Sequence, residues 1–150
     1  LIANLQQNFQ NLKRKNLAGV KDLVWQIKVE EGLKVSLILG VQWGRALYLV
    51  CRAGGRVMLR RENKFGTILQ GEGSASGLLQ DRDLLFLLSP RFSEIVSLEE
   101  LCQNLNHFSL NEIAERLTPL VHRSQDTSGV AALIVQFENL PTLNVEDENH

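Results

Sequence analysis

Side chains able to support hydrolysis are present, but their spacing assembles no catalytic site. Ser89, Ser93 and Ser128 could each supply a hydroxyl nucleophile, yet none lies in a Gly-x-Ser-x-Gly turn. The 3 histidines stand alone, and no two of them have the spacing of metal ligands or sit in a motif beside a serine. We therefore predict no catalytic residue in this sequence.

Asp126 is the acidic residue that we single out as a candidate metal ligand. It lies in the polar segment at residues 123–129, and carboxylate oxygens are the ligands that hard divalent cations prefer. A loop aspartate more commonly accepts backbone hydrogen bonds and caps a turn. The sequence leaves both roles open and favours the turn.

Basic residues are concentrated between positions 52 and 64. Arg52, Arg56 and Arg60 are all even-numbered and could share one strand face across a turn, since alternate residues of a strand lie on the same face. Such a face predicts a patch for an anion or an acidic partner. The alternative is a solvated basic face in which the aliphatic stems cover apolar surface.

Composition excludes several classes of protein. The 150 residues suffice for a single domain with its own core. A net charge of −1 gives no field that would gather nucleic acid, and no apolar run has the roughly 20 residues of a membrane span, so we expect no direct membrane insertion. Cys51 and Cys102 are too few for a disulfide framework or a zinc site, and with no leader sequence they predict a cytoplasmic location.

The apolar periodicity predicts strands in the middle of the chain and helices on either side. An amphipathic helix is expected at residues 1–15, and capping boxes starting at Ser97 and Ser109 predict two more. Predicted strands lie at residues 23–30, 34–42, 46–51, 56–60, 65–69, 84–88 and 130–137. The glycine-rich stretch at residues 71–77 is typical of a flexible loop.

This order of elements is typical of an α+β fold. An antiparallel β-sandwich-like core flanked by helices fits the pattern, with the last strand, apolar on both faces, in the sheet interior. We assign residues 1–140 to one domain. Residues 141–150 are mostly polar and acidic, and we expect them to form a flexible tail.

Three segments, at residues 46–59, 76–92 and 124–135, follow one another in a distinctive order. The first is an apolar strand, the turn Ala-Gly-Gly-Arg and another strand; the second leads from Ser-Gly-Leu through an apolar run to Ser-Pro-Arg; the third places Asp-Thr before a final apolar strand. Together they resemble the metal-dependent serine/threonine phosphatases of the protein phosphatase 2C type. The resemblance extends from about residue 35 to residue 137 and implies a truncated version of that fold.

The departures from the family pattern concern the metal ligands. The family has an aspartate at the position of Pro90 and a glycine at Arg91, and its Gly-Asp-Ser-Arg turn has become Ala-Gly-Gly-Arg, with Gly54 at the aspartate position. Asp126 survives, next to Thr127 instead of asparagine. The family's upstream metal loop has no counterpart. Because a two-metal mechanism needs several carboxylates, the resemblance implies the scaffold without the chemistry.

The function that we predict is a catalytically inactive phosphatase-like domain, a protein-interaction or regulatory module that binds a protein partner or a second copy of itself. No cofactor is expected. The alternative is a fragment of a Mn²⁺- or Mg²⁺-dependent phosphoserine/phosphothreonine phosphatase whose remaining ligands lie upstream or on another chain. A third interpretation is an unrelated α+β scaffold, with a strand order unlike that of the family.

Overall fold

The computed structural model describes residues 17–25 and 35–142. The helix expected at residues 1–15 and residues 143–150 of the expected tail lie outside this range. Among the described residues no helix is both long and apolar enough to cross a membrane.

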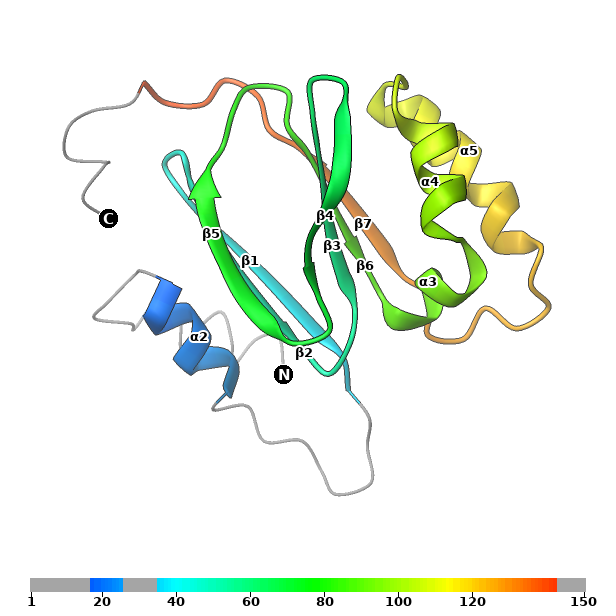
Figure 1. The fold of residues 1–150 in the computed structure, drawn as a ribbon, viewed down its shortest axis with the longest axis horizontal. Coiled ribbons are helices and arrows are strands. Elements are labelled where there is room, and N and C mark those ends of the chain that lie inside the picture. Colours follow the sequence, from blue (N-terminus) through cyan, green and yellow to red (C-terminus); the bar gives the residue numbers. More distant parts are fainter. Residues whose placement is uncertain (1–16, 26–34, 143–150) are drawn as a thin grey trace.

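Four helices and seven strands make up the described chain (Figure 1). The helices are α2 (Leu17–Trp25), α3 (Pro90–Ile95), α4 (Leu98–Leu105) and α5 (Leu110–His122). The strands are β1 (Leu37–Trp43), β2 (Ala46–Arg52), β3 (Arg56–Arg61), β4 (Lys64–Gln70), β5 (Gly73–Leu78), β6 (Leu84–Leu88) and β7 (Ala132–Gln136).

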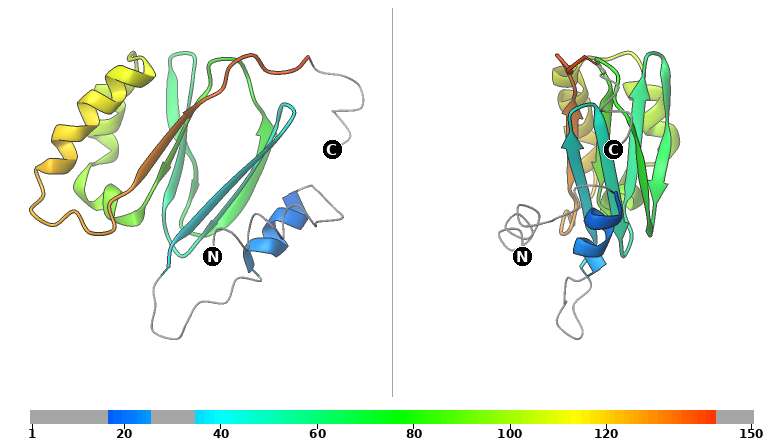
Figure 2. Two further views of the ribbon diagram at one scale, coloured as in Figure 1. Left: turned by 180° about the vertical axis from the view of Figure 1, so that it is seen from behind. Right: turned by 90° about the vertical axis from the view of Figure 1, so that its left-hand side faces the viewer.

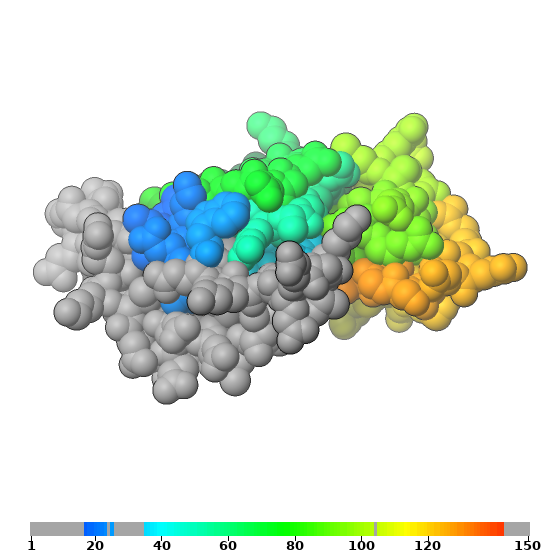
Figure 3. Space-filling view, turned by 90° about the horizontal axis from the view of Figure 1, so that it is seen from below, coloured from blue at the N-terminus to red at the C-terminus, as the bar shows by residue number. Residues whose placement is uncertain are grey.

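The strands form two antiparallel sheets that pack face to face. One sheet has the order β1-β2-β5 and the other the order β4-β3-β6-β7. Helix α2 lies against the outer side of the three-stranded sheet, and α3, α4 and α5 cover the outer side of the four-stranded sheet (Figures 1 and 2). Viewed from below, the sheets lie between these helical layers (Figure 3). The α+β sandwich expected from the sequence is therefore confirmed.

Three apolar clusters fill the spaces between these layers. The largest lies between the four-stranded sheet and the helices, where Phe86, Leu88 and Phe92 are buried. A second lies between the two sheets and includes Leu49, Val57 and Leu85. A third joins Val20 of α2 to Tyr48 and Val50 of β2. Strand β2 thus has apolar neighbours on both faces, as its continuous apolar sequence predicted.

Serine caps fix the starts of three consecutive helices. Ser97 and Glu100 form a reciprocal capping box at α4, and the Ser109 hydroxyl accepts the Glu112 amide at α5. Both helices were predicted from these residues. Helix α3 was not predicted: Ser89 caps it and Pro90 occupies its first turn, where a missing N–H costs nothing. Pro119 lies inside α5 without ending it.

Three predicted elements are wrong. Residues 23–25 are helical instead of extended, because Leu17, Val20 and Leu23 share a helical spacing. Leu17 and Val20 pack in the cluster with β2, and Leu23 is buried. Residues 73–78, expected in a loop, form β5, because they complete a backbone ladder along β2 that outweighs their weak strand propensity.

The third error concerns β7, which was expected inside a sheet. It lies at an edge of the four-stranded sheet, as far as the described residues extend. Its sequence is apolar on both faces because Ile134 packs toward the helices while Val135 packs between the sheets. Leu133, which precedes Ile134 and lies on the same face of the strand as Val135, is 57% exposed.

A buried ion pair joins the two sheets at the end opposite the β2–β3 turn. The Asp83 carboxylate, 1% exposed, accepts hydrogen bonds from Nε and Nη2 of Arg61 at 3.0 and 2.8 Å and from the Gln80 amide at 2.8 Å. Nη2 of Arg61 also donates to the carbonyl of Leu78, at the end of β5. The hydrogen bond with Asp83 raises the pKa of Arg61 above its ordinary value.

Removing the two members of this pair should have unequal effects. Arg61→Ala leaves the buried Asp83 carboxylate without its cation and should lower the free energy of unfolding by about 3 kcal/mol. Asp83→Asn should cost less, because the Arg61 side chain is 36% exposed and can be hydrated. Urea unfolding at neutral pH measures both. Arg123→Ala, which breaks an exposed pair with Glu100, is the control. An Arg61→Ala loss no larger than that of Arg123→Ala would show that the buried charge has no special need of its cation.

Candidate functional site

Three segments distant in the sequence meet at one end of the sandwich. They are the β2–β3 turn at residues 53–55, the start of α3 at residues 89–91 and the loop before β7 at residues 126–131. Ser89 links two of them, because its hydroxyl donates to the Gly129 carbonyl at 2.8 Å and accepts the Ala131 amide at 2.9 Å. These are the segments in which the resemblance places metal-ligand positions.

Gly54 and Pro90 are in direct contact in this cluster. A Cβ atom added to Gly54 would lie 2.9 Å from Cγ of Pro90, and the glycine has a φ of +100°, a conformation that other residues rarely adopt. The Gly54 carbonyl lies 3.1 Å from the Ser36 hydroxyl and 2.8 Å from the Cys51 thiol, which both donate to it. The two positions thus come together, but a pyrrolidine ring and a tight backbone turn fill the space between them.

Asp126 has the contacts of a turn residue. Its Oδ1 accepts the Ser128 amide at 2.9 Å, and its backbone carbonyl accepts the Ser124 hydroxyl at 3.0 Å and Nη2 of Arg91 at 3.3 Å. The Ser128 hydrogen bonds, backbone first, and then the Arg91 charge lower the pKa of this exposed carboxyl. The stability that Asp126 adds is therefore present above its unfolded pKa and is lost as the pH falls through the lowered value.

Two of the serines considered as nucleophiles make structural contacts. The Ser89 hydroxyl, besides its bonds to Gly129 and Ala131, accepts the Phe92 amide at 3.2 Å, so it is fully used as a helix cap. The Ser128 amide serves the Asp126 turn. No group of three or more His, Cys, Asp or Glu side chains in the described range is placed to hold a metal ion.

The expected patch of Arg52, Arg56 and Arg60 does not share a face. Arg52 lies over the ring of Trp25 at 5.5 Å, on the outer side of the three-stranded sheet. Arg56 and Arg60 alternate with inward-facing residues of β3 and point to the helical side of the other sheet. Nη1 of Arg60 donates to the carbonyls of Leu105 and Phe108, and burial lowers its pKa.

Two ion pairs were not predicted from the sequence. The Arg61–Asp83 pair unites residues 22 positions apart, and the only local signal was an aspartate directly before the buried strand β6. Arg123 binds Glu100 in a bidentate pair and also donates to the Leu120 and Ile95 carbonyls, so it joins the ends of α3 and α5 to the start of α4.

Comparison of the fold with solved structures finds serine/threonine phosphatase domains. The Mycobacterium tuberculosis phosphatase PstP/Ppp matches 90% of this chain over 80% of its own length, with a TM-score of 0.69 and 17% identity. The SpoIIE phosphatase domain from Bacillus subtilis matches 96% of this chain over 78% of its own, with a TM-score of 0.63 and 12% identity. The chain has the protein phosphatase 2C fold. The third interpretation expected a strand order unlike that of the family, and that expectation is wrong.

A further match concerns the metal. The catalytic domain of PstP in complex with two manganese ions matches 90% of this chain over 77% of its own, with a TM-score of 0.66 and 18% identity. No protein-family model matches the sequence, and no curated protein matches it either. At these identities the likeness extends to the fold alone.

The described residues of the three converging segments offer few oxygen ligands for a divalent cation. Among the described residues, Gly54 and Pro90 supply no side-chain oxygen, and the Arg91 guanidinium, which donates to Glu94 and to the Asp126 carbonyl, brings a positive charge. Asp126 is left as a single carboxylate already engaged by its own turn. Hard cations need several oxygen ligands.

The Gly54–Pro90 contact can be tested by a double-mutant cycle. Gly54→Ala should lower the free energy of unfolding by about 2 kcal/mol, because it adds a Cβ atom at positive φ against the proline ring. In a Pro90→Ala background the same substitution should cost less, since the ring is gone. Gly77→Ala, where an added Cβ meets nothing within 4 Å, is the control for urea unfolding. Equal losses in both backgrounds would contradict the contact.

Proposed function

We propose that this chain is a catalytically inactive domain of the phosphatase fold that acts as a protein-interaction or regulatory module. The observation that supports this proposal is the contact of Gly54 with Pro90, the residue before Arg91. The resemblance places metal ligands at Gly54 and Pro90, and neither residue has a side-chain oxygen. A metal-bound hydroxide needs carboxylates at these points, and the described cluster offers Asp126 alone. The free thiols Cys51 and Cys102 support a reducing compartment, hence the cytoplasm.

The competing proposal is an active phosphatase whose missing ligands come from upstream residues or from another chain. In that case Asp126 would bind Mn²⁺ or Mg²⁺, and phosphoserine or phosphothreonine would be the substrate. The observation in its favour is that the segments at residues 53–55, 89–91 and 126–131 still converge. The bond from Ser128 to the Asp126 carboxylate counts against it, since a metal would have to compete with that amide.

A response to manganese would overturn the proposed inactivity. We expect this chain to show no Mn²⁺-dependent hydrolysis of p-nitrophenyl phosphate or of a phosphothreonine peptide, and no shift of its thermal midpoint in millimolar Mn²⁺ compared with a chelator control. A ligand that binds the folded state alone at 100 times its Kd stabilises it by about 2.7 kcal/mol, which moves the midpoint by several degrees. A chelator-reversible shift that disappears in Asp126→Ala would overturn inactivity and favour the phosphatase.

The edge strand β7 supports the interaction half of the proposal. An edge strand presents unpaired backbone groups, and proteins usually protect it with charges, proline or a bulge. β7 has the sequence Ala-Leu-Ile-Val-Gln, which contains neither a charge nor a proline, and Leu133 is 57% exposed. A second copy could pair its own β7 antiparallel to this edge. In such a two-fold dimer both copies contribute the same surface.

Sedimentation equilibrium tests this pairing. We expect the chain to dimerise as its concentration rises, and Leu133→Lys to weaken the dimer by placing a charge in the apolar contact. Leu98→Lys, at a similarly exposed leucine at the start of α4, should leave association unchanged. A chain that stays monomeric throughout, or a dimer that both substitutions weaken equally, would contradict the homodimer.

A further inference from the structure

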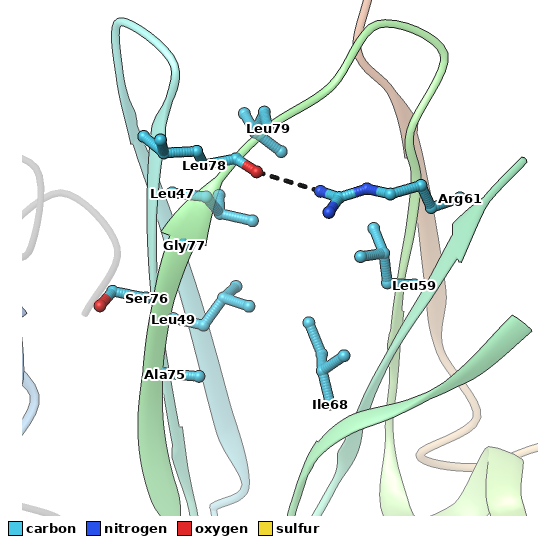
Figure 4. A pocket seen from close by; sticks show the side chains of 10 residues that line it. All are labelled: Leu47, Leu49, Leu59, Arg61, Ile68, Ala75, Ser76, Gly77, Leu78 and Leu79. Carbon is cyan, nitrogen blue, oxygen red and sulfur yellow. Dashed lines mark hydrogen bonds between the residues drawn. The ribbon is translucent and has the colours of Figure 1, made fainter. Parts of the chain in front are cut away.

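A cavity of about 220 Å³ lies between the inner faces of the two sheets. Leu47 and Leu49 of β2 and Ala75 of β5 line one side, and Leu59 and Ile68 line the other (Figure 4). The cavity is separate from the cluster around Gly54, because its lining includes no residue of that cluster. Its walls are mainly aliphatic, so a ligand that fits them must be apolar over most of its length.

The cavity exists because β5 carries small residues on its inward face. Gly77 pairs with Leu47 and Ala75 with Leu49, so the β5 side of the ladder contributes almost no side-chain volume there. A Cβ atom added at Gly77 would meet nothing within 4 Å. Leu78 and Ile68, at the cavity, are 45% and 41% exposed, which indicates that solvent reaches its opening.

The only charged side chain that lines this cavity, among the described residues, is that of Arg61. Its guanidinium extends from the end of β3 toward β5, across one end of the space (Figure 4). Nε and Nη2 are held by Asp83 and by the Leu78 carbonyl, whereas Nη1 donates to no atom of the described residues. The Asp83 carboxylate is buried and also accepts the Gln80 amide, so it holds the guanidinium in a fixed position. Nη1 remains able to donate a hydrogen bond to a ligand.

From this arrangement we infer that the cavity binds a single-chain aliphatic carboxylate. The alkyl chain lies between Leu47, Leu49 and Ile68, and the carboxylate accepts a charge-assisted hydrogen bond from Nη1 of Arg61. A cavity of ~150 Å³ lined by apolar side chains accepts benzene, so this larger one suits a chain of about eight carbons. Since a single cation lines the site, a compact monoanion fits better than a phosphate ester. This inference is independent of the proposed function.

Octanoate is the probe, and methyl NMR of the unmodified protein is the measurement. Octanoate should shift the methyl signals of Leu47, Leu49 and Ile68 with saturation in the millimolar range. Affinity should rise about fourfold for each methylene from hexanoate to octanoate and then level off as the cavity fills. 1-Octanol, which lacks the charge, should bind about tenfold more weakly because its hydrogen bond to Arg61 is not charge-assisted. Octylamine should bind more weakly still, since its ammonium meets the guanidinium.

Two substitutions on β5 locate the binding. Gly77→Leu places a side chain in the cavity and should abolish the octanoate shifts while its thermal midpoint stays level or rises, since it fills empty space. Ser76, one residue away, also borders the cavity, but its side chain points away from it, so Ser76→Leu should bind octanoate normally (Figure 4).

Three results would overturn the inference. They are the absence of any shift with octanoate or decanoate, equal or tighter binding of 1-octanol or octylamine, and unchanged octanoate binding in a folded Gly77→Leu. The ligand series needs no variant, so it decides the question even where a substitution impairs folding.

Discussion

The buried carboxylate of Asp83 imposes the strongest constraint on this fold. A charge that is 1% exposed is tolerable only with a cation and hydrogen-bond donors beside it, and Arg61 and the Gln80 amide provide them. Because Arg61 also donates to Leu78, the pair sets how far β3 of one sheet stands from β5 of the other at this end. The cavity lies beside this contact, where Ala75 and Gly77 are too small to close the gap that the arginine spans.

Local signals in the sequence predicted the elements whose conformation they determine. Ser97 with Glu100 starts a helix by hydrogen bonds within one turn, and the run at residues 84–88 forms a buried strand as expected. Strand β5 was not predicted because its glycines and serines favour a loop. They are extended because they pair with β2, which is distant in the sequence. The Arg61–Asp83 pair likewise depends on the pairing of β3 with β6.

The three segments that carry the resemblance lie together at one end of the sandwich, where Gly54 contacts Pro90 and Arg91 donates to the Asp126 carbonyl. Contacts between segments so distant in the sequence depend on the tertiary fold and could not be derived from their spacing. Arg52, Arg56 and Arg60 do not share one face, because the alternation rule holds within a strand and not across a turn between two sheets. Arg52 and Arg60 belong to strands of different sheets and so face opposite outer layers.

Ser89, Pro90 and Gly54 stabilise this end of the sandwich. Pro90 enters α3 at a position where its fixed φ and missing N–H suit a helix start, and Ser89 caps the same helix while holding the loop before β7. Gly54 permits the φ of +100° that brings its carbonyl to Ser36 and Cys51. A carboxylate at either point would give up one of these contributions, and an aspartate at Gly54 would also strain the turn. Where binding a cation is not required, stability alone therefore favours the residues now present.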